Sequence, residues 1–136
     1  MFAEFEKAIH AAEEAGAPIT LEGFKKTYRE LLDAYFGPNF VIDPELELEG
    51  LRIPHFYSAF YVYKYATGLS AAVALASQVL EGGSPAKYLN FLRSGGSRFP
   101  IETLAEAGVG MSSPAAVQAA LELFKRRVDE LEELLA

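Results

Sequence analysis

Hydrophobic residues recur at spacings of three and four along most of this chain, and that period is typical of α-helices that pack on one side. The first helix is predicted over residues 2–15, where glycine and proline follow directly. The residues that carry its pattern are Phe2, Phe5, Ile9 and Ala12.

A second helix is predicted between Thr20 and Gly37. The Thr20 hydroxyl can cap the free N–H groups of the first turn, and Gly37-Pro38 stops the helix. Its broad apolar face comprises Leu21, Phe24, Tyr28, Leu31 and Tyr35.

The middle of the chain predicts two longer helices and a short one. We expect the first from about Ser58 to Leu80, ended by Gly82-Gly83. The next helix is expected to begin at Ser84-Pro85, a cap followed by proline at the first helical position, and Gly95-Gly96 ends it. A short helix is expected from Pro100 to near Gly108.

The last helix is predicted to begin with a second cap-plus-proline pair, Ser113-Pro114. We expect its apolar stripe to be packed internally, with a coiled-coil dimer as a minor alternative because the stripe holds fewer than three heptads. The stripe consists of Val117, Leu121, Phe124, Val128, Leu131 and Leu135.

Residues 38–54 do not follow the helical pattern. Glutamate and leucine alternate from Glu45 to Glu49, which could form an edge strand or a short helical turn, and we expect irregular structure. The fold class predicted from the whole pattern is all-α. We expect a single bundle of five to six helices that occupies residues 1–136 as one domain.

Composition narrows the functional classes. The chain of 136 residues is 51% hydrophobic, so it can bury a core, and its net charge of −7 disfavours nucleic acid and anionic membranes as partners. It has no cysteine, which excludes disulfides and thiolate metal sites. We see no signal peptide and no stretch long enough to span a bilayer, and we expect a cytoplasmic protein.

The strongest local anomaly is a run of aromatic residues between positions 56 and 65. On a helix beginning near Ser58, Phe60 would share a face with Tyr63, and Tyr61 would share another with Tyr65. Aromatic rings therefore point in several directions. They could be the core of a tyrosine-rich helix, or a concave wall whose hydroxyls meet a polar ligand.

The two histidines differ in setting. His55 precedes the aromatic run and could be structural, or could donate a hydrogen bond to a developing oxyanion. His10 is expected at the surface or boundary of the first helix. With two histidines and no H-E-x-x-H pair, a zinc site within the chain is improbable.

Several blocks of the sequence resemble oligoendopeptidase F, of the thimet and oligoendopeptidase F family of zinc metallopeptidases. Two central blocks are long and specific, IPHFY at 53–57 followed by FYVYKYATG at 60–68. The resemblance covers nearly the whole chain. Its further blocks are MFAEFE at 1–6, YFGP at 35–38, YLNFLRSGGS at 88–97, PIE at 100–102, AGV at 107–109 and SP at 113–114.

The resemblance implies the C-terminal part of a zincin-like helical metallopeptidase that cuts short peptides in a deep channel. It implies that zinc is held by an H-E-x-x-H motif and a glutamate before Met1, so this chain should bind no metal and be inactive alone. It also implies that this portion forms a wall of the cleft, where His55 and Tyr63 stabilise the tetrahedral intermediate. Tyr57 is the second choice for the catalytic tyrosine, and the substrate-binding candidates are Tyr57, Tyr61 and Phe60.

Two further expectations concern packing and partners. Gly50 stands where the resemblance leads us to expect a bulky aromatic residue, which puts the packing of residues 45–52 in doubt. Apolar surface that missing parts would cover should drive self-association. The alternative to a peptidase portion is a free-standing helical module that binds a peptide or small ligand in a tyrosine-rich pocket without catalysis.

Overall fold

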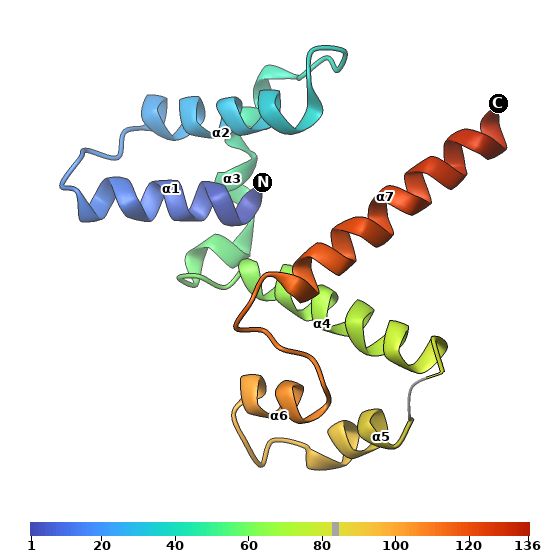
Figure 1. Ribbon diagram of the computed structural model, residues 1–136. Helices are drawn as coiled ribbons and strands as arrows, with labels where there is room; N and C mark the ends of the chain where they lie inside the picture. Colours follow the sequence, from blue (N-terminus) through green and yellow to red (C-terminus); the bar gives the residue numbers. More distant parts are fainter. Residues whose placement is uncertain (83–84) are drawn as a thin grey trace. The chain divides into compact units, whose positions relative to one another are not determined.

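The structure is a computed structural model that describes residues 1–82 and 85–136 (Figure 1). The described residues form helices and no strands, which confirms the predicted all-α class. The α-helices are α1 (Phe2–Glu14), α2 (Leu21–Phe36), α3 (Glu49–Arg52), α4 (Tyr63–Leu80), α5 (Pro85–Ser94), α6 (Pro100–Glu106) and α7 (Ala115–Leu135). Two 3₁₀ helices, η1 (Pro44–Leu48) and η2 (Pro54–Tyr57), flank α3. The seven α-helices of the described residues exceed the predicted five to six because α3 is a single short turn.

The chain divides into two compact units, Met1–Lys64 and Tyr65–Ala136, where the sequence pattern predicted one packed unit. The division falls just after α4 begins. Each unit has its own cluster of buried hydrophobic residues. Within the first unit, residues 38–62 pack back onto α1 and α2: η1 contacts α2, and the ring of Phe56 in η2 contacts Phe2 and Phe5 of α1.

The core of the first unit is aromatic. Phe5 of α1 is 2% exposed and meets the fully buried Tyr28 of α2 edge to face, with ring centroids 4.9 Å apart. The ring of Phe24 lies against Phe5 in the same way at 4.8 Å. Leu32 and Ile42 complete the buried cluster. Edge-to-face pairs add to the free energy gained by burial, so these rings hold α1 against α2.

Helix α2 confirms its predicted ends but not its whole predicted face. The Thr20 hydroxyl accepts a hydrogen bond from the N–H of Gly23 at 3.1 Å, and Gly37 ends the helix at a positive φ of 73°. Tyr28 is buried as expected, whereas Leu21 and Tyr35 are more than half exposed. The first unit has too few elements to cover the full width of the apolar face.

Residues 44–52 form two helical turns, η1 and α3, so the expectation of irregular structure is wrong and the helical alternative, not the edge strand, is found. The Asp43 carboxylate accepts the N–H of Glu45, and Pro44 occupies the start of η1. Gly50 of α3 is buried. A β-carbon built on it would lie 2.8 Å from Cζ of Phe24 and 3.1 Å from Cε1 of Phe5. The packing of residues 45–52, which the sequence left in doubt, therefore depends on glycine at position 50, because two aromatic rings fill the space beside it.

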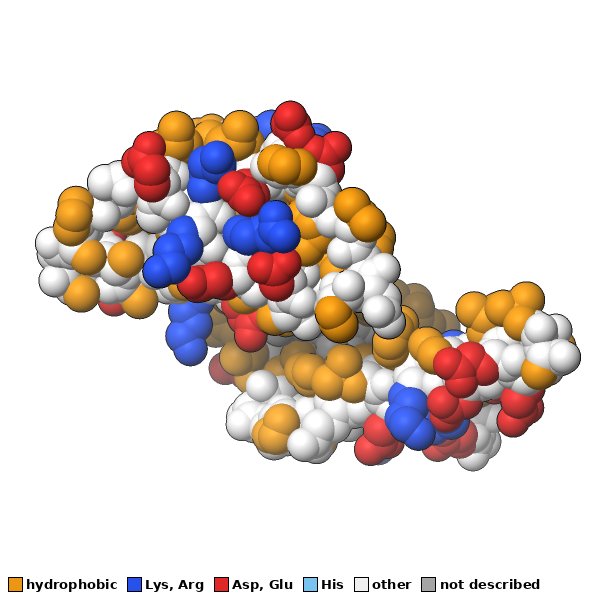
Figure 2. Space-filling view, turned by 90° about the horizontal axis from the view of Figure 1, so that it is seen from above, with side chains coloured by type: hydrophobic (Ala, Val, Ile, Leu, Met, Phe, Trp, Pro, Cys, Tyr) orange, Lys and Arg blue, Asp and Glu red, His pale blue; other side chains and the backbone are white. Residues whose placement is uncertain are grey.

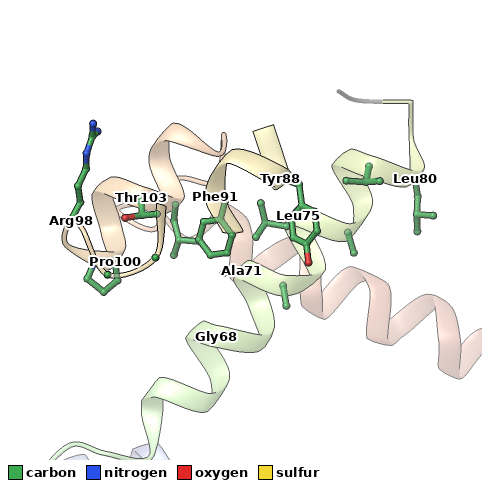
Figure 3. Close-up of a pocket in the computed structure, with 15 residues that line it drawn as sticks. Gly68, Ala71, Leu75, Leu80, Tyr88, Phe91, Arg98, Pro100 and Thr103 are labelled. Atoms are coloured by element: carbon green, nitrogen blue, oxygen red, sulfur yellow. The ribbon is translucent and has the colours of Figure 1, made fainter. Parts of the chain in front are cut away.

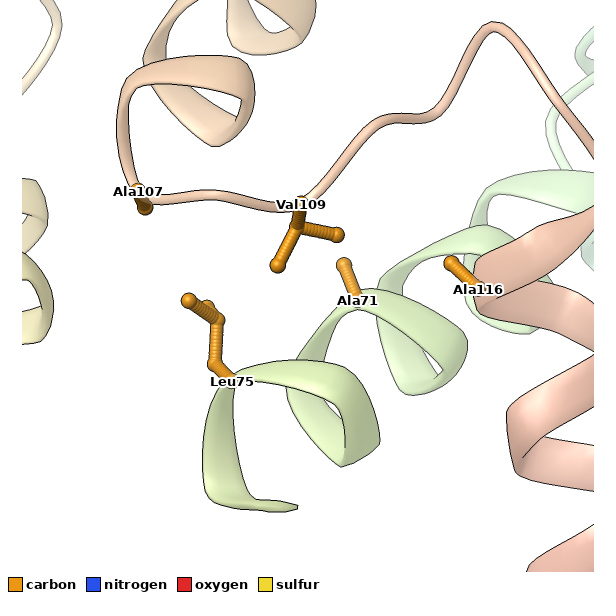
Figure 4. Close-up of a cluster of buried hydrophobic side chains, with 5 residues drawn as sticks. All are labelled: Ala71, Leu75, Ala107, Val109 and Ala116. Atoms are coloured by element: carbon orange, nitrogen blue, oxygen red, sulfur yellow. The ribbon is translucent and has the colours of Figure 1, made fainter. Parts of the chain in front are cut away.

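The core of the second unit consists mostly of small side chains. Figure 4 shows Leu75 and Ala71 of α4 facing Val109 and Ala107 in the segment after α6. Ala116, in the first turn of α7, completes the cluster. Small residues let the backbones approach closely, so α4 touches both the 107–109 segment and the start of α7. The Gln78 amide also donates a 3.0 Å hydrogen bond to the Gly108 carbonyl.

The predicted helix caps of the second unit have different outcomes. The Ser84 cap lies outside the described residues, while Gly82 has the positive φ of 85° typical of a helix end. The prediction that Ser113 caps α7 is wrong. Pro114 is the N-cap residue of that helix, and no side chain caps its N-terminus. Helix α6 ends before Gly108, as predicted, at a φ of 89°.

The apolar stripe of α7 is exposed, so the expectation of internal packing is wrong. Its residues range from 37% exposed at Val128 to 78% at Leu135, and only Ala116 of the helix is buried. The cause is that α7 touches α4 at its first turn and then runs on without a neighbour in its unit (Figure 1). Figure 2 shows hydrophobic side chains at the surface among acidic and basic ones.

No helix in the described part of the chain has the length and apolar character needed to cross a membrane.

Candidate functional site

The aromatic segment is built from a 3₁₀ turn, a bend and the start of a helix. Helix α4 begins at Tyr63 rather than near Ser58, so the predicted pairing of helical faces in this segment is wrong. The cause is Phe60, whose φ of 54° lies in the left-handed region and cannot continue a right-handed helix. Phe60 and Tyr61 therefore belong to the bend, and Tyr63 occupies the first position of α4.

Phe60 is held against α1. Its backbone N–H donates a 2.7 Å hydrogen bond to Oε1 of Glu6, and its ring stacks on the imidazole of His10 with centroids 4.3 Å apart. The side chain is 44% exposed. Phe60 is a predicted substrate contact, and His10 covers one side of its ring. His10 is partly buried, as expected of a boundary residue.

His55 and Tyr61 lie together. His55 sits in η2, and its imidazole lies 5.5 Å from the ring of Tyr61. The ammonium group of Lys64 lies over the same ring at 4.7 Å from its centroid. A cation over an aromatic face is attracted by the ring's negative π density. The structure thus gathers an imidazole, a phenol and an ammonium group, all of which can donate hydrogen bonds.

The remaining two candidate tyrosines are both exposed but are placed differently. The hydroxyl of Tyr57 donates a 2.7 Å hydrogen bond to the backbone carbonyl of Leu51, while its ring is 77% exposed. Tyr63 is 47% exposed at the start of α4. The Tyr57 hydroxyl therefore links η2 to the backbone of α3.

Sequence reasoning missed Glu6, which is 4% exposed and the partner of Phe60. The signal was present, since Glu6 follows Phe2 by four residues and precedes Ile9 by three. Those spacings place a carboxylate within the apolar stripe of α1. Lys64 was also missed, because a lysine next to several tyrosines has no distinctive spacing.

Two hollows lie near different parts of the chain. A small cavity of about 150 Å³ opens between α1, α3 and η2, beside Glu6, His10 and Tyr57. A larger hollow of about 750 Å³ belongs to α4, α5 and α6 of the second unit, and its walls are almost entirely apolar (Figure 3). Figure 3 shows Arg98 directed away from Leu75 and Phe91. Arg98 forms an ion pair with Glu106.

Metal-binding side chains do not cluster in the described part of the chain. No group of three or more histidine, aspartate or glutamate residues there could hold a metal ion. The two histidines face aromatic rings, His10 against Phe60 and His55 against Tyr61. The described residues therefore offer hydrogen-bond donors and apolar walls rather than a metal centre.

Comparison with known proteins gives the family of this all-helical chain. The sequence model of Peptidase family M3 matches residues 1–123, so the chain belongs to that family. This finding confirms the resemblance seen in the sequence, and the match includes every candidate site residue.

Known relatives place the chain near the oligoendopeptidase F branch. It is 51% identical to Oligopeptidase PepF of Bacillus subtilis over 99% of this chain and 20% of that protein. It is 45% identical to the plasmid-encoded Oligoendopeptidase F of Lactococcus lactis subsp. cremoris, over 98% of this chain and 23% of that protein. The crystal structure of oligoendopeptidase-F from Enterococcus faecium matches with a TM-score of 0.90 and 42% identity, over 99% of this chain and 26% of that one. The chain thus spans a fifth to a quarter of the proteins it matches.

Proposed function

We propose that this chain supplies one wall of the substrate cleft of a zinc metalloendopeptidase that cleaves short peptides. The observation that carries the proposal is the match to Peptidase family M3 over residues 1–123. That stretch contains the donor cluster around His55 and Tyr61. The names of its relatives, oligopeptidase and oligoendopeptidase, support peptides as the substrate class.

In the proposed mechanism His55 and Tyr63 donate hydrogen bonds to the peptide carbonyl oxygen as it gains negative charge. Donors placed in advance stabilise the transition state more than the ground state, which lowers the barrier. Tyr63 is the first choice because its position, three residues after Phe60, matches the family motif best, and Tyr57, whose hydroxyl donates to the Leu51 carbonyl, is the second. Tyr61 and Phe60 would line the path of the peptide at the bend.

Zinc, which the family resemblance implies for the whole enzyme, would activate the attacking water. The described residues do not fit a zinc site, since they contain no cluster of three ligands. We therefore assign no metal ligand to this chain, and we expect no peptidase activity from the chain alone. Its role in the proposal is to bind the peptide and to hold the developing charge.

A chimeric enzyme tests this function. Residues 1–136 replace the matching segment of the Bacillus subtilis oligopeptidase, and hydrolysis of internally quenched peptides is measured with and without a chelator. We expect chelator-sensitive cleavage by the chimera and none by the 136-residue chain alone. Replacing one transition-state donor, in His55→Ala or Tyr63→Phe, should lower kcat by about 10²–10³-fold.

Tyr57→Phe is the matched control, because it removes a hydroxyl whose partner is a backbone carbonyl. We expect this variant to keep kcat within about threefold of the unmodified chimera. The hydrogen bond that it loses, from the Tyr57 hydroxyl to the Leu51 carbonyl, does not involve the reacting carbonyl of the peptide. Full activity of both His55→Ala and Tyr63→Phe chimeras would overturn the proposal. Chelator-sensitive turnover by the isolated chain would overturn the expectation that it is inactive alone.

The alternative of a binding module without catalysis is favoured by one observation, the apolar hollow of about 750 Å³ between α4, α5 and α6. Cavities of this size and character accept small apolar ligands or side chains. The hollow is not the tyrosine-rich pocket that the sequence suggested. Binding of uncleaved peptides with NMR shift changes at Leu75 and Phe91, together with an inactive chimera, would favour this alternative.

We also propose that a second copy of the chain covers the exposed stripe of α7. Leu121 and Phe124 are 62% and 67% exposed on that helix. The stripe has the spacing of a coiled coil, and Arg127 and Glu132 flank it with opposite charges. In a parallel pair Arg127 of each copy would face Glu132 of the other.

A further inference from the structure

Glu6 is a buried carboxylate with a specific partner far away in the sequence. Its side chain lies on α1, is 4% exposed, and lines the small cavity of the first unit together with mostly apolar residues. Removing a carboxylate from water is unfavourable unless hydrogen bonds replace the lost hydration. The replacement here includes the backbone N–H of Phe60, whose nitrogen lies 2.7 Å from Oε1 of Glu6 and 54 positions later in the chain.

The partner of Glu6 is a strained residue. Phe60 has a φ of 54° and is the one non-glycine residue with positive φ in the described part of the chain. This conformation is unfavourable for an L-residue, so it persists only where surrounding contacts hold it. Two contacts from α1 do so, the hydrogen bond to Glu6 and the stacking of His10 on the ring.

Glu6 and His10 act from one face of the same helix. They are four residues apart, so their side chains lie one above the other on α1. One fixes the backbone of Phe60 and the other fixes its ring, which leaves the residue little freedom to relax toward negative φ. The contacts from α1 thus add to the local 3.1 Å hydrogen bond from the N–H of Tyr61 to the carbonyl of Ser58 that closes the turn.

The bend separates the two proposed donors. His55 lies before it in η2, and Tyr63 begins α4 directly after it. Tyr61, the residue after Phe60, packs against the imidazole of His55. A change of φ at Phe60 would therefore rotate Tyr61 and Tyr63 relative to His55.

We propose that Glu6 is a positioning residue that fixes the bend at Phe60 and so sets the placement of Tyr63 relative to His55. This inference rests on the proposed function of those two side chains. Glu6 itself does not touch the substrate. Its effect on the reaction passes through the backbone of Phe60, and a misplacement of a catalytic group by about 1 Å can lower a rate by about 10²-fold.

The first test is NMR spectroscopy of the full 136-residue chain. Glu6→Ala removes the acceptor, and Glu6→Gln keeps one oxygen but loses the charge. We expect the Phe60 amide proton to move upfield in both variants, and further in Glu6→Ala. The ring-current shifts that Phe60 imposes on His10 should shrink in the same order. Glu13→Gln, at an exposed position of the same helix, is the control and should change neither signal.

The second test uses the chimeric enzyme described above. We expect Glu6→Ala to lower kcat by about 10–10²-fold with KM within about threefold, and Glu6→Gln to recover part of that loss. Rates are divided by the concentration of folded enzyme. A merely structural role for Glu6 would lower the yield or the unfolding midpoint but leave kcat of the folded fraction unchanged.

The outcomes separate this inference from the function on which it rests. If His55→Ala and Tyr63→Phe lose activity while Glu6→Ala keeps its kcat, the positioning role is overturned and the proposed function stands. If none of the three loses activity, both are overturned. An unchanged Phe60 amide signal in Glu6→Ala would show that the bend does not depend on Glu6, whatever the kinetics.

Discussion

The hydroxyl of Tyr28 donates a 2.7 Å hydrogen bond to Oε2 of Glu49, which ties the middle of α2 to the start of α3. Tyr28 is fully buried, and the other carboxylate oxygen of Glu49 accepts from Arg52 at 3.0 Å. Burial, with a smaller contribution from Glu49, raises the pKa of the Tyr28 hydroxyl above its ordinary value. The aromatic core of the first unit thus contains a charge-assisted hydrogen bond.

Tyr28→Phe should lower the free energy of unfolding by about 1.5–3 kcal/mol, because a buried hydrogen bond to a charged group is lost. Urea unfolding of the 136-residue chain measures it. Tyr35→Phe is the matched control, since the Tyr35 hydroxyl donates to Glu4 at 2.6 Å but at an exposed position. We expect the control to lose less than about 1 kcal/mol. Equal losses would contradict the role given to burial.

The raised pKa of Tyr28 also predicts a loss of stability in alkaline solution. Its folded pKa lies above the unfolded value of about 10, so its contribution is fully present below pH 10. The contribution is lost progressively as the pH rises above 10 toward the folded pKa. The free energy of unfolding, measured from pH 8 to 11.5, should therefore fall more steeply for the wild-type chain than for Tyr28→Phe. Parallel curves would show that Tyr28 is not responsible.

Gly50→Ala should destabilise the chain by about 1–3 kcal/mol, because the added β-carbon would overlap the ring of Phe24. Gly68→Ala is the contrasting variant, since Gly68 lies within α4 and a β-carbon there meets no atom within 4 Å. We expect Gly68→Ala to stabilise by about 0.5–1 kcal/mol through helix propensity. The midpoints of thermal unfolding should move in opposite directions.

Leu75→Ala should lower the free energy of unfolding by about 2–3 kcal/mol, because Leu75 is 6% exposed in the core of the second unit. Leu80→Ala, on the same helix but 85% exposed, should change it by less than about 0.5 kcal/mol. Chemical unfolding followed by circular dichroism distinguishes the two. A similar cost at both positions would mean that Leu80 is covered in solution.

Phe124→Glu should shift the chain toward monomer in sedimentation equilibrium, because it places a charge in the exposed stripe of α7. Gln118→Glu adds the same charge on the same helix beside the stripe and should leave association unchanged. Neither variant should alter the helix content. A wild-type chain that sediments as a clean monomer at tens of micromolar would contradict self-association.

Sequence periodicity predicted the helices well where a capping residue or a glycine in the local sequence marks the helix end. The Thr20 cap and Gly37 fixed the ends of α2, and Gly108 fixed the end of α6. The beginning of α4 was missed because Phe60 has a positive φ and contacts Glu6 and His10 of α1. A pattern of nearby residues carries no information about a partner 54 positions away.

The candidate site was predicted in part. The sequence pointed to the histidine and tyrosines of residues 55–63, and the structure brings His55 against Tyr61. The supporting residues Glu6 and His10 could not be assigned, since a glutamate in an apolar stripe is informative only once its partner is known. The exposure of α7 could not be predicted from the sequence either. An apolar stripe indicates that one face of a helix can pack against another element, but it does not show whether the same chain supplies that element.

Because the stripe of α7 is exposed, the stability of this chain should depend on what binds to that stripe. A folded chain that carries large apolar side chains such as Leu121 and Phe124 on its surface has unused binding free energy. Anything that binds the folded chain and not the unfolded one raises the temperature of unfolding by mass action. Heat resistance measured for this chain should therefore depend on how concentrated the protein is and on what accompanies it.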